Sequence, residues 1–159
     1  MEGELQEAAC RVEMDSAFQQ VDLGVISTDD LRQPGARSTP VPFHIYLRDC
    51  LRTRSAVRNV NTGNLSWSAN QPVVSVAFMA TADADEPTLV HPDSMTLSGV
   101  GLRLLSDSQE TLTLGRRGRP KFLDPGQNTL TFYVVPERTL SPLAPGDFRA
   151  TVSFSLDYE

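Results

Sequence analysis

The last fourteen residues, "GDFRATVSFSLDYE" (146–159), alternate apolar and polar side chains up to the end of the chain. This period of two is typical of a β-strand with one buried face. Chain ends usually fray, so a long inward row in a terminal strand predicts that this strand lies across the core and needs a neighbour on its far side. The inward row consists of Phe148, Ala150, Val152, Phe154, Leu156 and Tyr158.

Shorter segments with apolar residues at alternate positions precede this strand, and Val21, Leu23 and Val25 share one face of the first of them. Stretches rich in Pro, Gly, Asp and Asn separate the segments, as turns do. No segment shows a convincing helical pattern. About seven strands at this spacing predict an all-β domain, a β-sandwich of immunoglobulin-like size. The expected strands lie within 18–27, 41–50, 72–80, 99–108, 110–115, 128–137 and 146–159.

Length and charge limit the class of protein. A chain of 159 residues with a net charge of -6 is expected to form one domain, and it is a poor candidate for binding nucleic acid or an anionic membrane. It contains no apolar run long enough to span a bilayer, and its first residues lack the features of a signal peptide. The two cysteines, Cys10 and Cys50, leave two alternatives: buried free thiols, or a disulfide formed in an oxidising compartment.

Residues that carry chemistry are scarce. His44 and His91 are the only histidines, His44 falls on the polar face of an expected strand, and "ADADE" (82–86) lacks the remaining spacing of a calcium loop. We therefore expect no enzyme activity, metal or cofactor. The basic run "GRRGRPKF" (115–122) predicts a solvated hairpin loop. Segment 51–71, which contains Trp67, predicts a long loop.

Four motifs occur in a recognisable order: "CRVEMDSAFQQVDLG" from Cys10, then "FHIYLRDC", "VSVAF" and the terminal "GDFRATVSFSLDYE". In order and approximate spacing they resemble the chaperone-usher pilus subunits, and the resemblance covers the whole chain. Its most specific parts are the Cys10 and Cys50 frame, the "VDLG" and the closing "DYE". Within the family, the first motif and the closing one look most like the terminator subunit of P pili, which ends assembly at the cell-anchored base.

The resemblance implies an incomplete immunoglobulin-like β-sandwich that lacks its last strand. It also implies a disulfide between Cys10 and Cys50. A periplasmic pilus chaperone would lend a strand to the open groove; at the outer-membrane usher, the amino-terminal extension of a neighbouring pilin subunit would replace it. The chaperone would also hold the terminal carboxylate of Glu159. The implied groove is lined by Phe148, Ala150, Val152, Phe154, Leu156 and Tyr158 against Val21, Leu23 and Val25.

The family pattern divides the chain in two. Residues 1–9, with Gly3 and Leu5 in one alternating row, are expected to be the remnant of a donor-strand extension, and residues 10–159 the pilin domain. The resemblance implies a longer extension and a signal peptide, so we interpret the sequence as trimmed. The expected location is the periplasm in transit and then the fimbrium on the bacterial surface.

Two alternatives to the terminator role remain. The alternative within the family is a minor adaptor or a major rod subunit. In another class, it is a small adhesive sandwich that binds carbohydrate, for which Trp67 and Tyr46 are the candidate aromatic platform. We expect no nucleic-acid partner.

Overall fold

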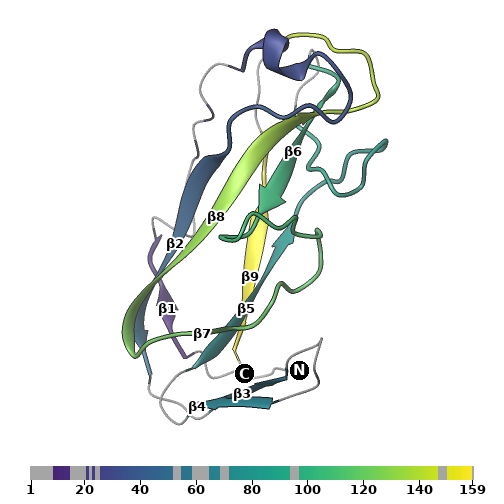
Figure 1. The fold of residues 1–159 in the computed structure, drawn as a ribbon. Coiled ribbons are helices and arrows are strands. Elements are labelled where there is room, and N and C mark those ends of the chain that lie inside the picture. The colour runs from purple at the N-terminus through teal and green to yellow at the C-terminus, as the bar shows by residue number, and fades with distance from the viewer. Residues whose placement is uncertain are drawn as a thin grey trace, which may run out of the picture.

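The chain forms two antiparallel β-sheets and a separate hairpin (Figure 1). The first sheet has the order β1-β2-β8-β6, the second has the order β7-β5-β9, and β3 pairs with β4. The computed structural model describes residues 9–14, 21, 23, 26–51, 55–58, 65–68, 72–93, 97–146 and 150–158, with the side chains of all except 55–58 and 65–68. The strands are β1 Arg11–Val12, β2 Val41–Cys50, β3 Ser55–Arg58, β4 Leu65–Ser68, β5 Val73–Met79, β6 Val100–Leu105, β7 Lys121–Phe122, β8 Gly126–Arg138 and β9 Ser153–Tyr158.

The inward rows of the two sheets meet in one apolar core. Ile45 of β2 and Leu130 of β8 form one register pair of the first sheet, and both are buried. Val76 and Phe78 of β5 belong to the same buried cluster. The ring of Phe78 lies edge-on to Phe132 of β8 at 5.0 Å between centroids and so joins the two sheets. The period-two patterns therefore identified the core faces of these strands correctly.

Strand β9 is shorter than the alternation suggests. The sequence predicts a strand over 146–159, but the strand begins at Ser153, and residues 147–149 and 159 lie outside the described part of the chain. The reason is the length of its partner: β5 ends at Met79, which is paired with Ser153. Residues Ala150–Val152 precede that pair and have no strand beside them among the described residues.

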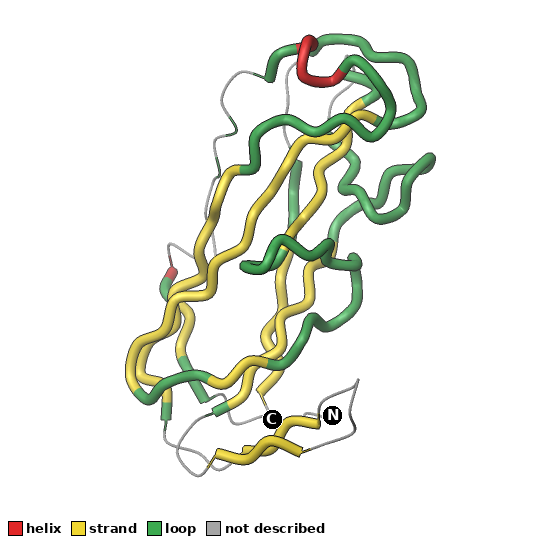
Figure 2. The backbone as a smooth tube through the Cα atoms, viewed as in Figure 1, coloured by secondary structure: helices red, strands yellow, loops and turns green. Residues whose placement is uncertain are grey.

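Three other expectations need correction. Val21 and Leu23 are not in a strand, and β1 comes earlier, at Arg11–Val12. Segment 51–71 is not a plain loop, because it contains the hairpin of β3 and β4. Segment 110–115 is not a strand; it makes one isolated bridge, Leu105 to Thr111. A four-residue 3-10 helix, η1 (Thr28–Leu31), lies at the end of the molecule remote from β3 and β4 (Figure 2).

Candidate strand-binding groove

Strand β9 is an edge strand within the described part of the chain. It pairs along its whole length with β5, from Val74 opposite Tyr158 to Met79 opposite Ser153. On its other side the sheet order places no strand. An edge strand offers a row of backbone N–H and C=O groups to any chain that can pair with it.

The side chains of β9 are covered less well than those of β5. The inward residues Val74 and Phe78 of β5 are 1% and 3% exposed. Opposite them, the inward residues of β9, Phe154, Leu156 and Tyr158, are only half-buried, although they pack against the same core. The Phe154 ring lies 6.4 Å from that of Phe78, centroid to centroid. The inner face is therefore closed over β5 and incompletely closed over β9.

The predicted groove residues that the structure describes are half-buried and pack against the same core cluster. Ser153 and Ser155 are exposed, so the two faces of β9 have the predicted parity. The groove residues placed in this way are Val21, Leu23, Ala150, Val152, Phe154, Leu156 and Tyr158. Val25, Phe148, Glu159, Gly3 and Leu5 lie outside the described residues.

The hydroxyl of Tyr158 is a polar atom in this apolar setting. It is buried and has no hydrogen-bond partner among the residues that the structure describes. Burial raises the pKa of the Tyr158 hydroxyl, because the phenolate would lose its hydration. A buried hydroxyl without a partner costs free energy.

The side chains of the basic run are exposed, as the sequence predicted, and its backbone also pairs with β5. The backbone N–H of Gly115 donates to the carbonyl of Phe78 at 2.7 Å, and that of Gly118 to Val76 at 2.9 Å. This segment therefore covers the edge of β5 opposite β9. The guanidinium of Arg117 forms an ion pair of 3.2 Å with Asp157 of β9. Sequence reasoning missed this tie because the two residues are forty positions apart.

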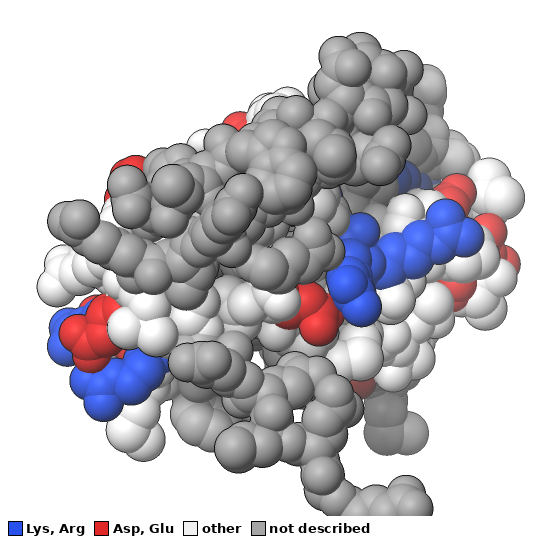
Figure 3. Space-filling model, turned by 90° about the horizontal axis from the view of Figure 1, so that it is seen from below, with Lys and Arg blue, Asp and Glu red and all other residues white. Residues whose placement is uncertain are grey.

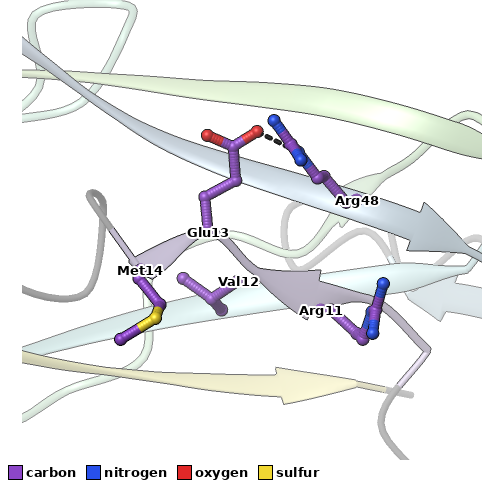
Figure 4. A pocket seen from close by; sticks show the side chains of 5 residues that line it. All are labelled: Arg11, Val12, Glu13, Met14 and Arg48. Atoms are coloured by element: carbon purple, nitrogen blue, oxygen red, sulfur yellow. Dashed lines mark hydrogen bonds and ion pairs between the residues drawn. The ribbon is translucent and has the colours of Figure 1, made fainter.

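The predicted disulfide between Cys10 and Cys50 is confirmed. Both cysteines are buried, and the bond joins the start of β1 to the end of β2. Beside it, Arg11 donates to Asp49 at 2.9 Å and Arg48 pairs with Glu13. Arg11, Glu13 and Arg48 line a hollow of about 340 Å³ with Val12 and Met14 (Figure 4). The bond and the ion pairs fix β1 to β2.

The described residues contain no group of metal-ligating side chains and no helix that meets the requirements for crossing a membrane. Nδ1 of His44 lies 3.0 Å from the hydroxyl of Thr131 on the neighbouring strand, and Nδ1 of His91 lies 3.4 Å from Asp83. Tyr46 is 41% exposed, while the side chain of Trp67 lies outside the described part.

Comparison with known proteins gives one consistent answer. A family model described as "Fimbrial protein" matches residues 1–159. "Fimbria A protein" of Serratia marcescens is 30% identical over 159 residues, covering 99% of this chain and 81% of that protein. "Probable major fimbrial subunit LpfA" of Escherichia coli O157:H7 is 28% identical over 159 residues, covering 99% and 80%.

A solved structure confirms the fold class. The P pilus rod subunit PapA aligns with a TM-score of 0.76 at 22% identity, covering 96% of this chain and 100% of that one. The likeness identifies the two sheets as the immunoglobulin-like sandwich of a pilin. Together with the match of the family model over the whole sequence, it leads to one conclusion: the chain belongs to the fimbrial protein family.

Proposed function

We propose that this chain is a fimbrial structural subunit whose groove beside β9 accepts a strand from another protein. One observation carries the proposal: β9 is an edge strand whose inward row is only half-buried, while the row of β5 beside it is closed. A strand laid along β9 would pair with its free backbone groups and cover that row with alternate side chains.

The donor would change during assembly. A periplasmic chaperone would first supply the strand, and the amino-terminal extension of a neighbouring subunit would replace it at the outer-membrane usher. Residues 1–9 of this chain, with Gly3 and Leu5, would belong to its own donor-strand extension, and residues 10–159 would form the pilin domain. Glu159 would be held by basic residues of the chaperone, and Phe148 and Val25 would complete the groove. The chain would pass through the periplasm and end in the surface fimbrium.

The position of the subunit in the fimbria is a finer question. The sequence motifs favour a terminator, in which the loop at 140–147 or bulky side chains near Phe148 would close the end of the groove. Two observations favour a subunit that repeats along the fibre. A relative aligned over 99% of the chain is named a major subunit. The described part of the loop is also bound elsewhere, since Ser98 and Ala144 exchange two backbone hydrogen bonds of 3.1 Å at the start of β6.

β6 is an edge strand of the first sheet and β9 an edge strand of the second, and the described part of the loop pairs with the residue before β6 rather than with β9. The segment that follows β6 supports this placement, as it covers the edge of β5 that faces away from β9. We therefore propose the repeating rank, that of a rod subunit, with the terminator and the minor adaptor as the competing hypotheses.

The function is tested by strand binding. The full chain is co-expressed in the periplasm with the fimbrial chaperone, and backbone hydrogen exchange of the purified complex is compared with that of the chain refolded alone. We expect the chain to be soluble mainly as the complex, with slow exchange at Ser153–Tyr158. A stable monomer that unfolds cooperatively, with β9 already protected, would show that the sandwich is complete and would contradict the proposal.

A further inference from the structure

A second opening of the sandwich lies on the side away from β9. It is a cleft of about 320 Å³ between segment 106–121 and the inner faces of β5 and β8. Its apolar floor includes Val76, Phe78 and Phe132. No residue of β1 or β9 lines it, so it is separate from the proposed strand-binding groove.

Backbone hydrogen bonds hold the segment over this cleft. Leu112 donates to Leu104 of β6 at 2.9 Å, whereas Gly115 and Gly118 donate to β5. The segment therefore crosses from one sheet to the other and is attached to both. The cleft beneath it is formed before any ligand arrives, which lowers the entropic cost of binding.

The rim of the cleft is basic. Four of its residues are cationic, Arg116, Arg117, Arg119 and Lys121, and two are acidic, Asp107 and Glu110. Lys and Arg side chains form an elongated group on this side of the molecule when it is seen from below (Figure 3). Lys121 pairs with Asp107 at 3.4 Å, Arg119 with Glu110 at 3.5 Å and Arg117 with Asp157.

Arg116, the fourth cationic residue of the rim, takes part in none of these three ion pairs. It is exposed, and among the described residues no carboxylate forms an ion pair with it. An apolar floor below an unpaired cation suits an apolar side chain that has an acidic neighbour.

A side chain of this kind is exposed elsewhere on the molecule. Leu140, just after β8, is 76% exposed. The next residue, Ser141, donates a hydrogen bond from its hydroxyl to Asp85, whose side chain is also exposed. Leu140 and Asp85 thus form an apolar projection with a carboxylate beside it, which we call the Leu140 knob.

The Leu140 knob is held in place by its surroundings. Thr139 is buried and donates to the carbonyl of Gly99 at 2.8 Å. Gly99 has φ of +79°, and a Cβ on it would lie 2.8 Å from Cα of Leu143, so only glycine fits this approach. The exposure of Leu140 is therefore a property of a well-packed loop, and contact with another molecule would explain it.

We infer that the Leu140 knob of one copy inserts into the basic-rimmed cleft of a second copy, with Asp85 beside Arg116. The two surfaces differ and lie at different places on the chain, so the contact is heterologous and leads to an open series of copies. It also leaves β9 free for its donor strand. The inference rests on the proposed function in its repeating form, in which copies of the chain are neighbours.

The test uses two complementary variants of the full chain, each purified with the same bound strand donor. Leu140→Asp removes the knob and keeps the cleft, while Arg116→Glu reverses the rim charge and keeps the knob. Native mass spectrometry of the wild type is expected to show a ladder of oligomers. Each variant alone should lose at least about tenfold in association constant, the change expected when a leucine side chain is no longer transferred from water or a charge pair is reversed.

Mixing the two variants gives the decisive result. One intact knob and one intact cleft remain in the mixture, so one-to-one dimers should form without a longer ladder. Arg116→Lys and Leu51→Asp, a change at another exposed leucine, serve as controls and should keep the ladder. Absence of wild-type oligomers, or a ladder unchanged by Leu140→Asp, would overturn the inference. Failure of the chain to bind the strand donor would instead contradict the proposed function. The oligomers of wild type and variants are then compared on the chain without a donor.

Discussion

Glu137 shows how a single residue stabilises the sandwich. It is 5% exposed, and its carboxylate accepts hydrogen bonds from Arg103 at 2.6 and 2.9 Å and from Arg37 at 2.7 Å. Burial acts to raise the pKa of Glu137, but the hydrogen bonds and charges of Arg103 and Arg37 outweigh it and hold the pKa below its usual value of 4.5. The hydrogen bond to Glu137 likewise raises the pKa of Arg103. The network joins β6, β8 and the segment before β2.

We predict that Glu137→Gln lowers the free energy of unfolding by about 3 kcal/mol at pH 7, because two arginines lose a buried partner. The folded-state pKa lies below the unfolded value, so the wild-type carboxylate contributes stability above pH 4.5 and loses it as the pH falls through the folded-state pKa. The difference between variant and wild type should therefore shrink below pH 4.5. Urea unfolding of the strand-bound chain at pH 7 and at lower pH measures this.

Asp30→Asn is the matched control, because Asp30 is exposed on η1. It should change stability by less than about 0.5 kcal/mol at either pH. An effect of Glu137→Gln that is equal at both pH values would show that the loss comes from packing rather than from charge.

The disulfide makes a second prediction at the residue scale. Replacing Cys10 and Cys50 by serine should lower the free energy of unfolding by about 4 kcal/mol on the chain-entropy model, since the bond closes a loop with a sequence separation of 40. Unreduced protein from the periplasm should have a mass two hydrogens below that of the dithiol form. Two alkylatable thiols in that material would contradict the bond.

At the scale of elements, long alternating strands were predictable and short ones were not. The patterns in β2, β5 and β8 extend over enough residues to identify both strand and inward face. Strands β3 and β4 have four residues each, "SAVR" and "LSWS", too few for alternation to be distinguished from chance. The start of β9 depends on where β5 ends, which is a property of the partner strand and cannot be inferred from the alternation alone.

The parity of β9 gives an element-scale prediction. Phe154→Asp should abolish binding of a strand donor, because it would place an unpaired carboxylate against Phe78 in the core. Ser155→Ala, on the exposed face of the same strand, should change affinity less than about twofold. Copurification of the chaperone with each variant, followed by competition titration of the purified complexes, measures the difference.

Because Phe154→Asp is expected to perturb the fold as well, Leu156→Ala provides a milder test. It shortens an inward side chain without adding charge and should weaken donor binding by roughly tenfold or more, since a leucine that the donor strand would cover loses most of its side chain. Equal effects of Leu156→Ala and Ser155→Ala would contradict the assignment of the two faces.

At the scale of the whole molecule, an open sandwich was predictable but the cleft and the Leu140 knob were not. The alternation predicts a terminal strand across the core, and the resemblance to the pilus subunits implied the open groove beside it. The cleft requires β5, β8 and segment 106–121 to come together, and the knob requires Ser141 to lie beside Asp85, fifty-six positions earlier. Contacts of this length depend on the complete topology, which no local pattern contains.

The last prediction decides the rank of the subunit. A repeating subunit must let an incoming extension begin pairing at an accessible end of its groove and displace the chaperone strand stepwise, whereas a terminator must refuse it. The described part of the 140–147 loop is hydrogen-bonded to Ser98 and packs against Gly99 before β6, so we expect the groove end to be accessible.

The complex of this chain with its chaperone is therefore mixed with a peptide that copies the extension of another fimbrial subunit, and native mass spectrometry follows the reaction over hours. We expect the peptide to replace the chaperone. A peptide with charges in its inward row is the control and should leave the complex intact, because those charges would be buried unpaired in the groove. If the chaperone is still bound after hours with the unmodified peptide, the groove is closed near Phe148 and the chain is a terminator. The strand-accepting fold then remains as described.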